Sequence, residues 1–226
     1  MSDQTRLAEF LAPYVSDHKK ALMSKVMSKR TRHLTVVLEN IYHPHNASAV
    51  VRSCDCFGIQ DIHIIEGDNE YNINPYVVRG AAKWISLYKY QQSETKENCF
   101  AQLKSNGYKL VGTSPNPEYK SINKFSIDEK TALVFGQEET GLSEFANSQM
   151  DDFVHIPMVG FTESFNISVS AAICLFELSN KIRESEVEWQ LSDTEKDSLI
   201  LDWYKNIIAR SDVLEREFLR ISNVDD

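Results

Sequence analysis

The chain has 226 residues, of which 42% are hydrophobic and 25% charged, as in an ordinary globular protein with one main domain and extensions. Its 24 Lys and Arg and 33 Asp and Glu give a formal net charge of −9 at pH 7, and this value argues against a generic nucleic-acid-binding protein. No apolar run approaches the roughly 20 residues of a membrane-spanning helix, and no secretory signal opens the chain, so we expect no membrane segment. The four cysteines show neither zinc-ligand spacing nor a disulfide framework, which predicts a cytoplasmic protein with reduced thiols and no metal site.

The charge is unevenly distributed along the chain. Residues 1–33 carry seven Lys and Arg against three acidic residues, which predicts a basic N-terminal helical arm. Residues 184–226 carry five Lys and Arg against twelve acidic residues, which predicts an acidic helical C-terminal extension. A basic helix face is more often merely solvated than ligand-binding, so the charge pattern alone leaves the function of the arm open.

Between the extensions, short apolar runs alternate with helical patterns, as in a parallel sheet with helices on both faces. In such sheets, ligands bind beyond the carboxyl ends of the strands. The predicted strands are 34–38, 62–65, 109–113, 131–135 and 152–156, and the predicted helices are 47–57, 96–105, 168–183 and one that opens at a capping box over 192–195.

Three polar segments lie at predicted transitions from strand to loop. The first, NASAVVR with Phe57-Gly58 after it, places Asn46 and Arg52 near the start of a helix, where they could hold a phosphate or orient a sugar hydroxyl. Taken alone this is a weak signal, because an Arg in the first turns of a helix is usually just exposed.

The second segment, FGQEETGLSE, follows a predicted strand and contains Glu138, which could cap a helix or bind ligand hydroxyls. It lacks both the Lys-Ser/Thr of a P-loop and the glycine spacing of a dinucleotide fingerprint. The third, IPMVGFTESFNISV, contains Asn166 and Ser168, which could equally be simple helix caps. Four of the eight glycines lie in these three segments, and this concentration favours one shared site over three unrelated turns.

In this order, the segments resemble the motifs of the SPOUT superfamily, in its TrmH/SpoU family of RNA ribose 2'-O-methyltransferases. The sequences LTVVLENIYHPHNASAVVRSCDCFG, LVFGQEETGLSE and IPMVGFTESFNISVSAA carry the resemblance, which covers about 34–181. It implies an α/β parallel-sheet SPOUT fold over 34–183 with a C-terminal deep trefoil knot, an exception to the rule against knots. It also implies a homodimer that binds S-adenosylmethionine in the knot, with the helical extensions on either side.

The resemblance also implies roles for individual residues. Methyl transfer from a sulfonium needs no metal, so positioning of the nucleophile supplies most of the catalysis. The family's catalytic arginine falls on Arg52, and we expect it to bind a phosphate and stabilise the developing oxyanion, because a guanidinium is always protonated in proteins. A role for it as the base stays open. The other implied catalytic residues are Asn46, Glu138, Ser164 and Asn166, and the implied cofactor-binding residues are Thr113, Gly136, Ile156, Met158, Phe165 and Ser168.

A basic arm and a helical extension on either side of the knotted domain resemble the layout of the tRNA D-loop guanosine 2'-O-methyltransferases in this family. The expected substrate is therefore guanosine 18 of tRNA, although the acidic extension departs from the basic one of the family. Methylation of rRNA or of another tRNA position stays open, as does a non-catalytic RNA-binding relative, while the missing fingerprint disfavours an oxidoreductase. The residues expected to meet RNA phosphates are Lys25, Lys29, Arg30, Arg32 and Arg79.

Overall fold

The computed structural model describes residues 3–67, 71–72, 74–91 and 96–222, so the outermost residues of both extensions lie outside it. The chain divides into two compact units. One unit is Thr31–Trp189, and the other combines Met1–Arg30 with Gln190–Asp226. The two ends of the chain, far apart in sequence, therefore build a single unit.

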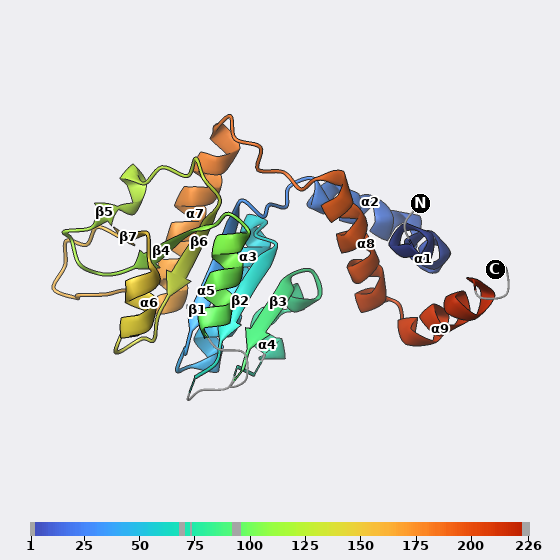
Figure 1. Ribbon diagram of the computed structural model, residues 1–226, viewed down its shortest axis with the longest axis horizontal. Helices are drawn as coiled ribbons and strands as arrows, with labels where there is room; N and C mark the ends of the chain where they lie inside the picture. Colours follow the sequence, from blue (N-terminus) through green and yellow to red (C-terminus); the bar gives the residue numbers. More distant parts are fainter. Residues whose placement is uncertain (1–2, 68–70, 73, 92–95, 223–226) are drawn as a thin grey trace. The chain divides into compact units, whose positions relative to one another are not determined.

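A parallel sheet forms the centre of the Thr31–Trp189 unit (Figure 1). Among the described residues, seven strands pair in the order β3-β2-β1-β6-β4-β7-β5, and each neighbouring pair is parallel. The five predicted strands are confirmed to within one residue, whereas the edge strands β3 and β5 were not predicted. The strands are β1 (Leu34–Glu39), β2 (Asp61–Ile65), β3 (Ser86–Tyr90), β4 (Lys109–Thr113), β5 (Lys120–Ser121), β6 (Thr131–Phe135) and β7 (Asp152–His155).

Helices cover both faces of this sheet, and every residue of β1 and β6 is buried as a result. On one face, α3 (Pro44–Phe57) and α7 (Ile167–Glu184) pack over the larger core cluster. On the other face, α5 (Lys96–Ser105) and α6 (Glu144–Gln149) contribute to a second cluster. Helix α3 begins three residues before its predicted start, because Pro44 occupies the first helical turn, where its missing N–H costs nothing.

The segment between β4 and β6 passes around β7. From β4 the chain continues to β5 and a 3-10 helix, η3 (Ile122–Lys124), and then returns to β6 on the other side of β4. Strand β7 pairs with both β4 and β5 and therefore lies inside this excursion. The ammonium of Lys181 on α7 donates hydrogen bonds to the carbonyl oxygens of Ile122, Asn123 and Phe125 at 3.0, 2.8 and 3.0 Å, and so holds α7 against the excursion.

The unit of the two chain ends is helical. Its described helices are α1 (Asp3–Leu11), the 3-10 helix η1 (Ala12–Tyr14), α2 (Asp17–Met27), α8 (Asp193–Ile207) and α9 (Ser211–Ser222). The capping box at Ser192 forms as the sequence predicts, with Glu195 completing it. Trp203 of α8 is 2% exposed and anchors the unit's core. In the described parts of the chain, no helix has the length and apolarity to cross a bilayer.

Candidate active site

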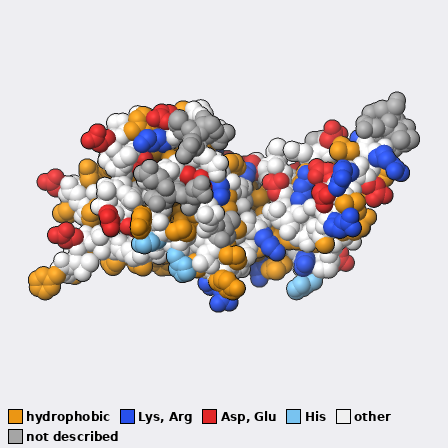
Figure 2. Space-filling model, turned by 90° about the horizontal axis from the view of Figure 1, so that it is seen from below, with side chains coloured by type: hydrophobic (Ala, Val, Ile, Leu, Met, Phe, Trp, Pro, Cys, Tyr) orange, Lys and Arg blue, Asp and Glu red, His pale blue; other side chains and the backbone are white. Residues whose placement is uncertain are grey.

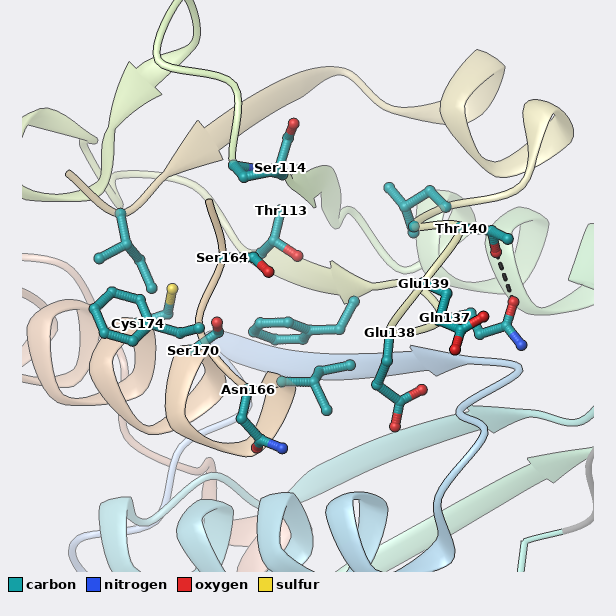
Figure 3. Close-up of a pocket in the computed structure, with 18 of the residues that line it drawn as sticks. Thr113, Ser114, Gln137, Glu138, Glu139, Thr140, Ser164, Asn166, Ser170 and Cys174 are labelled. Carbon is teal, nitrogen blue, oxygen red and sulfur yellow. Dashed lines mark hydrogen bonds between the residues drawn. The ribbon is translucent and has the colours of Figure 1, made fainter. Parts of the chain in front are cut away.

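A cavity of about 720 Å³ opens beyond the carboxyl ends of β4, β6 and β7, where ligands bind in parallel α/β sheets. Figure 3 shows that its polar side chains come from separate segments, with Thr113 at the end of β4, Glu138 after β6 and Ser164 before α7. Parallel strands end at one edge of a sheet, so these distant segments meet there. Of the predicted residues, those that line the cavity are Asn46, Thr113, Gly136, Glu138, Ile156, Met158, Ser164, Phe165 and Asn166.

The loop after β6 is a tight turn closed by its own backbone. The N–H of Gln137 donates to the carbonyl of Gly141 at 3.0 Å, and the N–H of Gly141 donates back at 2.9 Å. A Cβ at Gly136 would lie 2.2 Å from the carbonyl carbon of Gly141, so no larger residue fits there. The Thr140 hydroxyl donates to Gln137 at 2.6 Å and closes the turn further (Figure 3). The turn thus presents Glu138 in a fixed position.

Three side chains, one from each motif, form a hydrogen-bonded chain at the mouth of the cavity. The amide of Asn166 donates to the carbonyl oxygen of Asn46 at 3.2 Å, and the amide of Asn46 donates to Glu138 at 2.8 Å. In Figure 3 the side chains of Asn166 and Glu138 point to the same side of the cavity, toward α3. The carboxylate of Glu138 also accepts the backbone N–H groups of Tyr42 and His43 at 2.9 and 3.3 Å.

This network keeps Glu138 ionised. Partial burial would raise the pKa of its carboxyl group, but the hydrogen bonds from Asn46 and from backbone N–H groups outweigh that effect and hold the pKa below its usual value. The network therefore places a negative charge at the point where the three motifs meet.

The N-terminus of α7 is capped by the third motif. The side chain of Asn166 accepts the backbone N–H of Ser168 at 2.9 Å and its hydroxyl at 2.6 Å. Ser168, predicted to bind the cofactor, does not line the cavity and instead orients Asn166 from the first turn of the helix.

Arg52 lies outside the cavity. It is exposed on α3, six residues beyond Asn46, and it makes no hydrogen bond or ion pair with the described residues. The structure thus brings Asn46, Glu138, Ser164 and Asn166 together around the cavity and leaves the side chain of Arg52 exposed on α3.

The cavity is acidic. Three glutamates, Glu138, Glu139 and Glu163, line it, and no Lys or Arg stands among the described residues around it. A negatively charged lining favours a ligand with a positive charge. Sequence reasoning missed most of this charge, because Glu139 and Glu163 are exposed loop residues without a distinctive spacing.

A buried carboxylate that the sequence analysis did not single out holds the end of the loop between β6 and α6. Glu39, at the end of β1, is 4% exposed and accepts the backbone N–H of Ser143 at 3.0 Å and its hydroxyl at 2.6 Å. Ser143 caps α6 directly after the glycine turn. The only signal in the sequence is an acidic residue that ends an otherwise apolar strand.

The five residues predicted to contact RNA differ in their surroundings. Lys25, Lys29 and Arg79 are exposed. For Arg30 the prediction is wrong, because its side chain is 1% exposed and its guanidinium lies 5.7 Å from the ring centre of Trp203. Arg32 is half-buried, and its guanidinium forms an ion pair with Asp61 at 2.9 Å, so its role is structural rather than that of an open phosphate contact.

Known proteins resemble this chain in sequence. The model of the SpoU rRNA Methylase family matches residues 33–176. The chain is 39% identical, over 91% of its length and 93% of the relative, to a tRNA (guanosine(18)-2'-O)-methyltransferase of Borreliella burgdorferi. It is 31% identical to the enzyme of that name from Thermus thermophilus, over 72% of this chain and 82% of the relative.

Solved structures show the same fold. A TrmH/SpoU tRNA modifying enzyme of Aquifex aeolicus superposes with a TM-score of 0.77 and 25% identity, over 86% of this chain and 98% of that one. A SpoU methyltransferase of Streptomyces viridochromogenes, in complex with the cofactor AdoMet, superposes with a TM-score of 0.57 and 20% identity, over 72% and 62%.

Proposed function

The chain belongs to the SpoU rRNA methylase family, and we propose that it transfers a methyl group from S-adenosylmethionine to the ribose 2'-hydroxyl of guanosine 18 in tRNA. The observation that carries the proposal is the hydrogen-bonded chain of Asn166, Asn46 and Glu138 at the mouth of an acidic cavity. It joins the three motifs of the family in one place.

The cavity suits S-adenosylmethionine. This cofactor carries positive charge on its sulfonium and its ammonium, and the glutamates of the lining complement that charge. Ile156, Met158 and Phe165 supply an apolar wall for a flat base, while Gly136 lets backbone groups approach closely. When bound, the cofactor supplies an electrophilic methyl group.

The side chains of this protein would orient the nucleophile. Asn46 and Asn166 present amide groups that are held in place by Glu138 and Ser168, and such preorganised donors are suited to fixing a ribose hydroxyl. Arg52 would bind the adjoining phosphate from outside the cavity and stabilise the negative charge that develops on the hydroxyl oxygen as its proton passes to solvent water.

The choice of tRNA is supported by the relatives. Two that match most of this chain are named tRNA (guanosine(18)-2'-O)-methyltransferase, and the matches cover 93% and 82% of their own length. On the face shown in Figure 2, Lys and Arg side chains are more frequent over the helical unit than over the sheet unit. That distribution suits an RNA-gripping role for the extensions.

The trefoil knot, the homodimer and the cytoplasmic location belong to the same proposal. The insertion of β7 inside the excursion between β4 and β6 supports the knot. Exposed apolar side chains support the dimer. Val159 and Phe161, in the loop before α7, are fully exposed, and Phe176 on α7 is 56% exposed. A second copy of the chain would cover them. A tRNA substrate and four free cysteines support the cytoplasm.

One assay tests the function. The protein is incubated with methyl-labelled S-adenosylmethionine and an unmodified tRNA transcript, and the labelled nucleoside is identified. We expect 2'-O-methylguanosine at position 18, and a transcript with 2'-deoxyguanosine there serves as the matched control without a nucleophile. Label in rRNA instead would show that the substrate is rRNA rather than tRNA. No label in any RNA would favour an RNA-binding protein without catalytic activity.

The variant Arg52→Ala separates catalysis from cofactor binding. Because Arg52 lies outside the cavity, we expect transfer to fall at least about 100-fold while the affinity for S-adenosylmethionine, measured by calorimetry, stays unchanged. Full activity of this variant contradicts the role given to Arg52.

A further inference from the structure

A one-turn helix presents an exposed ring and an exposed guanidinium beside the proposed ribose site. Helix α4 (Pro75–Val78) carries Tyr76, whose side chain is 87% exposed, and is followed by Arg79, which is also exposed. Among the described residues no ring or cation stacks on Tyr76, and so exposed a tyrosine offers a flat face to a ligand.

The turn is rigidly attached to α3. Asn74 caps it, donates its backbone N–H to the hydroxyl of the buried Ser48 at 3.1 Å, and places its side chain 3.2 Å from the ring of His45. Val78 is 2% exposed and packs into the core on the other side of the turn. Both attachment points on α3 flank Asn46, so the position of Tyr76 is fixed relative to the proposed ribose site.

The backbone of Arg79 is in an uncommon conformation. Its φ and ψ are 50° and 33°, the left-handed region, and the next residue, Gly80, has a φ of 84°. Glycine adopts this conformation at lower cost than arginine. The chain therefore keeps a strained arginine on its surface at this position, and arginine is the side chain best suited to binding phosphate.

The neighbouring helix α3 carries two further exposed side chains, His45 and Arg52. They are seven residues apart, about two full turns, so they lie on one stripe of α3 that ends beside α4.

We propose that α4 docks RNA next to the target nucleotide, with the ring of Tyr76 stacked on an unpaired base and Arg79 bound to a neighbouring phosphate. The inference rests on the proposed function. An enzyme that modifies a nucleotide in a folded loop must draw it out of the stack, and aromatic side chains then compensate the unstacked bases. The stripe from Arg79 to Arg52 would follow the backbone on either side of that nucleotide.

The first experiment measures KM for an unmodified tRNA transcript in the variants Tyr76→Ala and Tyr76→Phe. We expect Tyr76→Ala to raise this KM about tenfold or more, the usual effect of losing one stacked base, and Tyr76→Phe to stay within about threefold because the ring is kept. Val77→Ala, a truncation on the same turn, is the matched control and is expected to leave KM unchanged. Cofactor affinity and the thermal midpoint are measured for each variant.

The second experiment uses Arg79→Gly. Since glycine is favoured at this φ, we expect the thermal midpoint to stay equal or rise while the affinity for tRNA falls about fivefold and its salt dependence weakens. This combination cannot arise from unfolding of the turn.

The outcomes separate this inference from the proposed function. If the wild-type protein methylates no tRNA, the proposed function fails. If it methylates tRNA and Tyr76→Ala keeps the wild-type KM, or Tyr76→Phe is as defective as Tyr76→Ala, the stacking role is overturned. If Arg79→Gly binds tRNA with unchanged salt dependence, the phosphate contact is overturned.

Discussion

Asn46 connects the three motifs, since its amide donates to Glu138 and its carbonyl oxygen accepts from Asn166. Asn46→Asp replaces the donor with a second carboxylate near Glu138, and two such groups cannot both ionise without a rise in pKa. We therefore expect the methyl-transfer rate of Asn46→Asp at pH 7.5 to lie about tenfold below that of Asn46→Ala. The gap should narrow below about pH 6, as one carboxylate takes up a proton. Identical pH profiles of kcat for the two variants would contradict this electrostatic role.

The burial of His63 is expected to make the sheet unit less stable in acid. Its ring is buried on β2 and stacked on Tyr88 and Tyr90 at 4.9 and 5.9 Å, and burial lowers its pKa to about 4. In the unfolded chain its pKa returns to about 6.5, so the unfolded state takes up a proton first. The contribution of the neutral His63 ring to the free energy of unfolding is therefore fully present above pH 6.5, and it is lost as the pH falls toward 4.

The shift corresponds to at most about 3 kcal/mol. We expect His63→Phe, which keeps a stacked ring, to lose less stability than the wild type between pH 7.5 and pH 4.5. Urea unfolding of both proteins at these pH values measures the difference. Parallel losses in the two proteins would show that other groups cause the acid sensitivity.

At the scale of elements, Lys181 joins α7 to η3 through its three hydrogen bonds to carbonyl oxygens. Lys181→Met keeps the aliphatic stem and removes the donors, so we expect a loss of about 2 kcal/mol in the free energy of unfolding. Faster hydrogen exchange over 122–125 should accompany it. Lys124→Met, which changes an exposed lysine on η3 itself, is the control with little expected effect. An equal loss in both variants would contradict the joining role of Lys181.

The sequence predicted the central elements well, because each buried parallel strand is a continuous apolar run and α3 ends at a glycine with positive φ. It missed β3, where only the last of five residues is buried and no apolar run or alternation marks the strand, and β5, which has only two residues. It placed one helix after the capping box over 192–195, whereas Arg210 at φ 58° separates two helices there, α8 and α9. Edge strands and helix breaks depend on contacts outside the local pattern.

The candidate site was predictable to a similar extent. Motif order identified the residues that meet in the cavity, because parallel strands bring their carboxyl ends to one edge. Charge pattern could not show which basic residues fold inward: Arg30 lies over Trp203, and Arg32 pairs with Asp61. Both partners are distant in the sequence, so only the tertiary structure distinguishes these two arginines from Lys25 and Lys29.

At the scale of the whole molecule, the net charge of −9 means that attraction to RNA must come from local basic groups. Two exposed lysines of α2 and the segment after it, Lys25 and Lys29, are such groups, whereas Arg30 is buried. We expect the double variant Lys25→Ala and Lys29→Ala to weaken tRNA binding and to reduce the slope of log K against log salt by about 1.5, the value for two lost phosphate contacts.

Arg30→Ala is the matched contrast, because it removes a neighbouring positive charge that faces Trp203 rather than solvent. We expect it to destabilise the protein by about 2 kcal/mol through the lost cation–π contact and packing and to leave the salt slope unchanged. Binding titrations at several salt concentrations and thermal melts of both variants measure the two effects. A reduced salt slope in Arg30→Ala with normal stability would show that Arg30 contacts RNA after all. An unchanged slope in the double lysine variant would show that the N-terminal arm does not bind RNA.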